Sequence, residues 1–184
     1  MTEASTLHLP VFYTCTTATP DGPPLEIAWG SLAFESYGVI CGSHLIRPPA
    51  AWISELARDA CALQPYGLTL SDLREFGTPP REIAVHMNES LAQRELFSAV
   101  PEDDGRIRRM FDAAKIAPKF ALELVDADEL IGELARLRDL LPAAAARARR
   151  EAELMCLTGI RAEAKVRFLA TYWGLVAWHN LAAA

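Results

Sequence analysis

The sequence lacks several features that would assign it directly to a functional class. It has no excess of basic residues, because 18 Lys and Arg stand against 24 Asp and Glu, giving a formal net charge of −6. That balance disfavours a protein that clamps nucleic acid over a wide surface. No metal-ligand or redox spacing links the cysteines and histidines, which are Cys15, Cys41, Cys61, Cys156, His8, His44, His86 and His179.

Long apolar runs are also missing. None is long enough to span a bilayer, and Met1 to Ser5 lack the basic start and apolar stretch of a signal peptide. With cysteines that form no disulfide framework, these features predict a cytoplasmic protein without a membrane partner. The 184 residues are 51% hydrophobic, which is enough for a full core. No repeat or linker divides them, so we expect one domain over residues 1–184.

The apolar pattern predicts three strands, then an alternation of helices and strands, then helices only. Strands are expected over residues 7–15, 25–34, 38–46, 95–98 and 120–125. Helices are expected over residues 51–61, 69–77, 79–91, 103–115, 128–140, 142–156 and 160–181. In the first strand, alternation places Val11, Tyr13 and Cys15 on one face and Phe12 on the other. The order predicts an α/β fold with a mixed five-stranded sheet, its first three strands antiparallel, flanked by helices.

Three blocks of sequence carry a family resemblance. They are Phe12-Tyr13-Thr14-Cys15-Thr16-Thr17 with the following Leu25-Glu26-Ile27, the stretch from Leu96 to Asp104, and Ile160-Arg161-Ala162 through Val166. In this order and context they resemble the DnaQ-like 3′–5′ exonucleases of the DEDDh class, which have a ribonuclease H-like fold. The corresponding family patterns are Asp-x-Glu-Thr-Thr-Gly with an Ile-Glu-Ile strand, an acid that follows a strand, and His-Arg-Ala-x-x-Asp-Val.

The resemblance implies that most catalytic positions have changed. Tyr13 and Cys15 stand where the family keeps its first two acids, Ile160 where it keeps a histidine, and Lys165 where it keeps the last aspartate; Asp104 alone is retained. The family reaction uses two Mg²⁺ or Mn²⁺ ions, which need oxygen ligands, mainly carboxylates. A phenol, a thiol and an ammonium group do not replace them. We therefore expect the metals and the exonuclease activity to be lost, and no cofactor.

The family fold also predicts how the changed positions meet, because its first strand and last helix face one another across the metal site. We expect Lys165 to pair with Asp104 as the counter-charge in place of the metals, while Tyr13, Cys15 and Ile160 fill the remaining space. Two alternatives stay open at this point. Cys15 is a nucleophile activated by Lys165, or the site binds metal in an altered way. Asp103 is expected only to interact with the dipole of its helix.

Other positions are candidates for binding. Thr16 and Thr17, with Arg106 and Arg109, are the candidate nucleic-acid contacts. The arginine runs at 106–109 and 147–150 are either solvated helix faces or a phosphate-binding stripe. The apolar stretch 172–179 is either core packing or a partner surface.

Together these features predict a catalytically inactive DnaQ-like domain, a pseudo-exonuclease. It is expected to act as a binding or scaffolding subunit of a nucleic-acid-processing complex, with a protein partner and weak nucleic-acid binding. The alternatives are an active metal-dependent 3′–5′ exonuclease with atypical ligands and a homodimeric structural protein.

Overall fold

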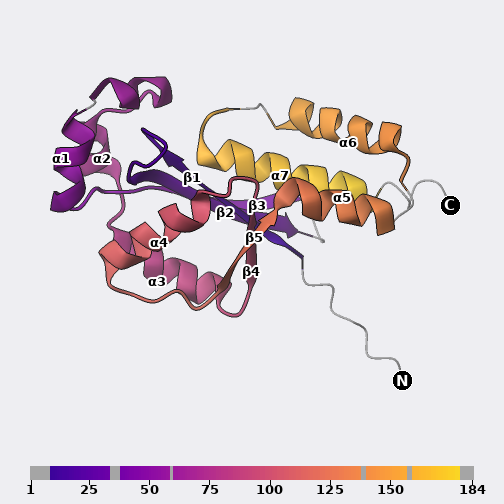
Figure 1. Ribbon diagram of the computed structural model, residues 1–184, viewed down its shortest axis with the longest axis horizontal. Helices are drawn as coiled ribbons and strands as arrows, with labels where there is room; N and C mark the ends of the chain where they lie inside the picture. The colour runs from indigo at the N-terminus through magenta and orange to yellow at the C-terminus, as the bar shows by residue number, and fades with distance from the viewer. Residues whose placement is uncertain (1–8, 34–37, 59, 138–139, 157–158, 179–184) are drawn as a thin grey trace.

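A five-stranded mixed sheet forms the centre of the protein (Figure 1). The computed structural model describes residues 9–33, 38–58, 60–137, 140–156 and 159–178. The strands are β1 (Val11–Thr17), β2 (Pro24–Ala33), β3 (Gly38–Leu45), β4 (Glu95–Ser98) and β5 (Ala121–Asp126). Their order is β3-β2-β1-β4-β5, with β1, β2 and β3 antiparallel and β4 and β5 parallel to β1. The expected sheet and its antiparallel start are confirmed.

The helices also follow the expectation within a few residues. They are α1 (Ala50–Arg58), α2 (Leu70–Phe76), α3 (Pro80–Leu91), α4 (Asp103–Ala114), α5 (Ala127–Leu137), α6 (Pro142–Met155) and α7 (Ala162–Trp178). A 3₁₀ segment, η1 (Ala60–Tyr66), was not expected. The predicted ends at Leu7, Phe34 and 179–181 lie outside the described residues. No helix within the described ranges is both long and apolar enough to cross a membrane.

Local sequence explains where two of these helices begin. Thr69 and Asp72 form a capping box at the start of α2: the Asp72 amide donates to the Thr69 hydroxyl, and the Thr69 amide donates to the Asp72 carboxylate. Pro80 opens α3 at a position where the missing N–H has no intrahelical partner to lose.

The two faces of the sheet have separate cores. One face packs against α3 and α4 and contains Val11, Tyr13 and Cys15 of β1. The other packs against α5, α6 and α7 and contains Phe12 of β1. The alternation predicted for β1 is therefore confirmed. Figure 1 shows α3 and α4 below the sheet, α6 and α7 above it, and α5 toward its right end.

Helix α7 lies very close to the sheet. A Cβ added at Gly30 of β2 would stand 2.6 Å from the Ile40 carbonyl oxygen and 3.0 Å from Cγ1 of Val166 on α7. Tyr172, Trp173 and Val176 are buried in the same core, so the described part of the apolar C-terminal stretch is core packing. This contact holds α7 close to β2 where Gly30 pairs with Phe12 of β1.

Candidate functional site

Asp103 is the buried acid at the centre of the candidate site. Its residue is 0% exposed, at the first position of α4. Oδ2 accepts hydrogen bonds from the hydroxyls of Thr14 on β1, at 2.6 Å, and Ser98 on β4, at 2.8 Å. Oδ1 accepts from the Arg106 guanidinium at 2.8 Å. The carboxylate is thus held by two hydroxyls and one cation, as a buried charge requires.

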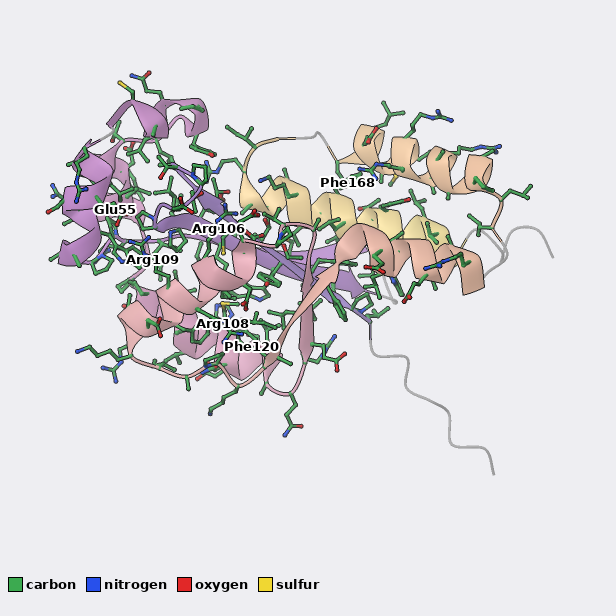
Figure 2. All side chains as sticks on the ribbon, in the orientation of Figure 1. Glu55, Arg106, Arg108, Arg109, Phe120 and Phe168 are labelled. Atoms are coloured by element: carbon green, nitrogen blue, oxygen red, sulfur yellow. The ribbon has the colours of Figure 1, made fainter. Side chains whose placement is uncertain are left out.

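Arg106 has a second contact that ties the site to the loop between β1 and β2. Its other terminal nitrogen donates to the Pro20 carbonyl at 3.2 Å. Arg109, one turn further along α4, donates to the Asp21 carbonyl at 3.1 Å, pairs with Glu55 of α1 and lies over the Trp52 ring. Figure 2 shows Glu55 and Arg109 close together between α1 and α4, with Arg106 nearer the sheet. These arginines therefore hold α4, the loop and α1 together.

The four residues predicted to contact nucleic acid are instead buried or bonded to other residues of the protein. Thr16 and Thr17 are buried in β1. The side chain of Arg106 is only 14% exposed and is bonded to Asp103, and that of Arg109 is divided between the Asp21 carbonyl and Glu55. The structure does not bring these four side chains together on one open surface.

The expected pairing of Lys165 with Asp104 is wrong. Asp104 faces outward from α4 and pairs with Arg108, whose Nε lies 3.0 Å from each carboxylate oxygen. This hydrogen-bonded pair raises the pKa of Arg108. Asp103, expected only to interact with the helix dipole, takes the buried position instead, and its counter-charge is Arg106. Among the described residues, Lys165 forms no ion pair with a carboxylate.

Tyr13 and Cys15 do not face the last helix, contrary to the expectation. Both are buried in the core beneath α3 and α4, on the face of the sheet opposite α7. Burial raises the pKa of the Tyr13 phenol, and burial followed by the charge of Asp103 raises the pKa of the Cys15 thiol well above its usual value. Lys165 and Arg106 act in the other direction on Cys15 but are the smaller influences. Cys15 is therefore a protonated core thiol, which is unsuited to nucleophilic attack.

Ile160 does not fill the space around the site. Its residue is 49% exposed, in the segment just before α7. The residues that do reach the site from this segment are its neighbours in sequence, Arg161 and Ala162. The expectation that Ile160 packs against Tyr13 and Cys15 is therefore wrong.

Glu26 is a second buried acid, for which the sequence predicted no role in the site. It lies on β2, opposite Thr16 of β1, and is 2% exposed. Its carboxylate accepts from Nε and Nη2 of Arg161, at 2.9 and 3.1 Å, and from the backbone N–H of Ala162 at 3.0 Å. The last bond satisfies a free donor at the start of α7, and the pair raises the pKa of Arg161. Its position as an acid inside an otherwise apolar strand could have predicted that Glu26 is buried and paired.

A hollow of about 290 Å³ lies between the middle of β1, the segment after β4, α6 and α7. We call it the α7 hollow; its lining includes Thr14, Ala99, Val100, Arg149, Lys165 and Phe168. The Arg149 guanidinium lies 5.8 Å from the ring centres of Phe168 and Tyr172 and 3.5 Å from Glu153. Figure 2 shows Phe168 on α7 below α6. The hollow thus combines a cationic rim, an aromatic ring and the Thr14 hydroxyl that donates to Asp103.

This arrangement does not fit the pair of metal ions that the resemblance implies. Hard divalent ions bind through several carboxylate oxygens. Strand β1, Val11–Thr17, has no acidic residue in any register. Both oxygens of Asp103 already accept hydrogen bonds, one of them from a guanidinium. Within the described residues, no three His, Cys, Asp or Glu side chains are grouped so that they could hold a metal ion.

The fold is similar to that of solved exonucleases. E. coli Exonuclease I in complex with a dA16 oligonucleotide has a TM-score of 0.59 and 16% identity over 91% of this chain, and its complex with dT13 gives 0.57 and 14% over 95%. Exonuclease X in complex with 5′-overhanging duplex DNA gives 0.50 and 13%, covering 95% of this chain and 93% of that one.

The chain spans only 40% of the first Exonuclease I chain and 42% of the second. No family model matches the sequence, and no curated protein matches it. At these identities the likeness shows that the chain has an exonuclease-like α/β fold.

Proposed function

We propose that this chain is a catalytically inactive, DnaQ-like domain that binds a nucleic-acid strand at the α7 hollow, as a subunit of a nucleic-acid-processing complex. The observation that carries the proposal is the state of Asp103. It is buried and neutralised by Arg106 at 2.8 Å, where a two-metal nuclease needs carboxylates free to bind cations.

The loss of hydrolysis follows from electrostatics. A divalent ion at Asp103 would have to displace Arg106 or the hydroxyl protons of Thr14 and Ser98, which are 2.6 and 2.8 Å from Oδ2. It would also lie near Lys165 on the wall of the α7 hollow, and like charges repel strongly where water is excluded. Two unfavourable changes, a displaced donor and a nearby like charge, would thus accompany binding of even the first of two ions.

The same features favour a strand of nucleic acid. Lys165 and Arg149 offer cations to phosphates, and Phe168 offers a ring on which a base can stack, the arrangement used by proteins that bind single strands without cutting them. The solved neighbours include Exonuclease I with single-stranded oligonucleotides and Exonuclease X with DNA carrying a 5′ overhang. Because the whole chain has a net charge of −6, binding should be weak and sensitive to salt.

The first experiment measures hydrolysis. Purified protein is incubated with end-labelled single- and double-stranded DNA and RNA in Mg²⁺ or Mn²⁺, beside Asp103→Asn and Asp104→Ala. We expect no release of nucleotides by any of the three proteins. Release from the 3′ end that Asp103→Asn abolishes would overturn the proposal and favour an active exonuclease with atypical ligands.

The second experiment measures binding to the same oligonucleotides in EDTA, by fluorescence anisotropy over a range of salt concentrations. Lys165→Ala should weaken binding and reduce the salt slope, log K against log salt, by about 0.7, the value for one phosphate contact on a single strand. Arg136→Ala, on the exposed surface of α5, is the matched control, because Arg136 has only a 3.8 Å pair with Glu133. Equal losses in both variants would contradict a site at the hollow.

A protein partner is a second candidate ligand, favoured by apolar side chains exposed around α6. Leu141, Leu154, Met155 and Ile160 are 73%, 81%, 69% and 49% exposed. Large apolar side chains exposed at both ends of one helix favour protein contacts. Leu154→Asp should abolish copurification with a cognate subunit while leaving oligonucleotide binding unchanged. Sedimentation at several concentrations tests the homodimer alternative, in which the same variant would shift a dimer to a monomer.

A further inference from the structure

Two histidines that are 42 residues apart in sequence meet at the edge of the sheet. His44 lies on β3 and His86 on α3, and Nε2 of His44 is 3.3 Å from Nδ1 of His86. The spacing in the sequence gave no sign of this pair. Both belong to the side of the sheet that packs against α3, on the face opposite the α7 hollow. The pair is therefore independent of the site described above.

Trp29 holds the two imidazoles in place. Its ring stacks on His44, with ring centres 5.3 Å apart and an angle of 20° between the planes. His86 meets the same indole edge-on at 5.4 Å and meets His44 edge-on at 5.4 Å. Trp29 is 7% exposed and belongs to the core, whereas His86 is exposed. The two nitrogens thus converge from rings supported on a rigid base, with access from solvent.

The distance between the nitrogens fits a shared metal ion. Imidazole nitrogens bind Zn²⁺ at about 2.0–2.1 Å in tetrahedral geometry, which places two such ligands ~3.3–3.4 Å apart. Imidazole is also the side chain preferred by Cu²⁺ and Ni²⁺. Neutral imidazole is the form that binds transition-metal ions.

We propose that His44 and His86 form a binding site for one divalent transition-metal ion such as Zn²⁺, Cu²⁺ or Ni²⁺. Among the described residues, no third His, Cys, Asp or Glu joins them in a metal-binding group, so water completes the coordination. Mg²⁺ does not fit this site, because Mg²⁺ requires oxygen donors and the two donors here are nitrogens. The ion would connect β3, the edge strand of the sheet, to α3.

Metal titration of the untagged full chain tests the site. Zn²⁺ and Ni²⁺ are titrated in competition with a chromophoric chelator, and Cu²⁺ is followed by electron paramagnetic resonance. We expect one ion per chain, two nitrogen ligands in the copper spectrum, and an increase in melting temperature with Zn²⁺ but not with Mg²⁺.

Single substitutions then identify the ligands. His86→Gln should weaken binding at least tenfold and remove the zinc-dependent increase in melting temperature, and because His86 is exposed on α3 this variant should fold normally. His44→Gln should do the same, although it also removes a ring stacked on Trp29. The control is the double variant His8→Gln/His179→Gln, which keeps the pair and should bind as the original chain does.

Three results would overturn the proposal. They are no binding at millimolar metal, binding that His86→Gln leaves unchanged, and binding that is lost only in the control. In the first case the 3.3 Å contact is an ordinary hydrogen bond between neutral imidazoles. None of these results bears on the α7 hollow, because the nuclease and oligonucleotide assays are run in different variants.

Discussion

Replacing Arg106 by methionine removes the guanidinium that pairs with a fully buried carboxylate. Asp103 is 0% exposed, and the Arg106 side chain is 14% exposed. Methionine keeps much of the volume of the arginine side chain and supplies no charge. After the substitution, Asp103 keeps its two hydroxyl donors, Thr14 and Ser98, but its negative charge has no cation beside it.

The expected loss is large for a single side chain. Breaking a buried ion pair by removing one partner costs about 3–5 kcal/mol, and the lost bond to the Pro20 carbonyl adds about 1 kcal/mol. The remaining hydroxyl bonds to a charged acceptor are retained, which places the total at the lower end of the combined range, at about 4 kcal/mol. Domains of this size have about 5–15 kcal/mol of stability, so the variant should be folded but marginal.

Urea unfolding followed by tryptophan fluorescence and circular dichroism measures the effect. The matched control is Arg108→Met, two residues further along α4. Its partner Asp104 forms an exposed i,i+4 pair, with the Arg108 side chain 59% exposed, so the loss should be about 0.5 kcal/mol or less. The double variant Asp103→Asn/Arg106→Met should be more stable than Arg106→Met alone, because the unpaired charge is gone.

The reasoning would be refuted by a small or additive effect. If Arg106→Met costs no more than Arg108→Met, the carboxylate does not depend on Arg106. The stability lost in the double variant is also compared with the losses in Asp103→Asn and Arg106→Met measured separately. If it equals their sum within about 0.5 kcal/mol, Asp103 and Arg106 are not coupled. In either case the neutralised acid could not explain the proposed absence of metal binding.

Three further predictions concern the fold around the site. Gly30→Ala should destabilise the protein by about 1–3 kcal/mol in the same assay, because its Cβ would meet the Ile40 carbonyl of β3 at 2.6 Å and Cγ1 of Val166 on α7 at 3.0 Å. An unchanged midpoint would show that β3 and α7 are not held this closely to Gly30. The hydrogen bonds from Thr69 lower the pKa of Asp72. The charged Asp72 carboxylate therefore adds to the free energy of unfolding above its ordinary pKa, and this addition is lost as the pH falls through the pKa of the folded state. Thr69→Ala should flatten the acidic limb of a curve of stability against pH. Cys61, which is exposed, should react fastest with a thiol reagent while Cys15 stays protected until unfolding, and early labelling of Cys15, found by mass spectrometry, would contradict its placement in the core.

Much of the fold followed from periodicity that the structure confirms. The alternation of Val11, Phe12 and Tyr13 assigned the two faces of β1 correctly, and the Thr69–Asp72 pair marked the start of α2. The 3₁₀ segment Ala60–Tyr66 was missed because it contains Pro65 and has no apolar repeat of its own. Short segments of this kind depend on tertiary packing rather than on local pattern.

The site was harder to predict because it depends on which of two adjacent residues faces inward. Asp103 and Asp104 are about 100° apart around α4, and the family pattern selected Asp104. Yet Asp103 lies on the same stripe as Ile107, Met110 and Phe111, at spacings of four, seven and eight residues. The inward stripe of α4 predicts that Asp103 is the buried acid, whereas the resemblance in sequence pointed to Asp104.

A similar conflict explains the error at β1. The motif alignment placed Tyr13 and Cys15 at the acid positions, and the family arrangement required those positions to face the last helix. The alternation of the strand places Phe12 and Thr14 on that side instead, since α7 packs against Phe12 and the hollow beside α7 is lined by Thr14. The absence of an acid from β1 does not depend on this register, because residues 11–17 read VFYTCTT.

The charges of α4, β2 and α7 around the candidate site share one feature. The acids Asp103, Glu26 and Glu163 are each paired with an arginine, respectively Arg106, Arg161 and Arg167, at 2.8–2.9 Å. Lys165 then adds a cation that no carboxylate of the described residues pairs with. A metal site requires the opposite balance, with carboxylates in excess of cations. The junction is instead neutral to positive, which disfavours a bound cation and favours an anionic ligand such as a phosphate. The arginines and Lys165 thus account together for the expected loss of hydrolysis and the expected gain of metal-independent binding.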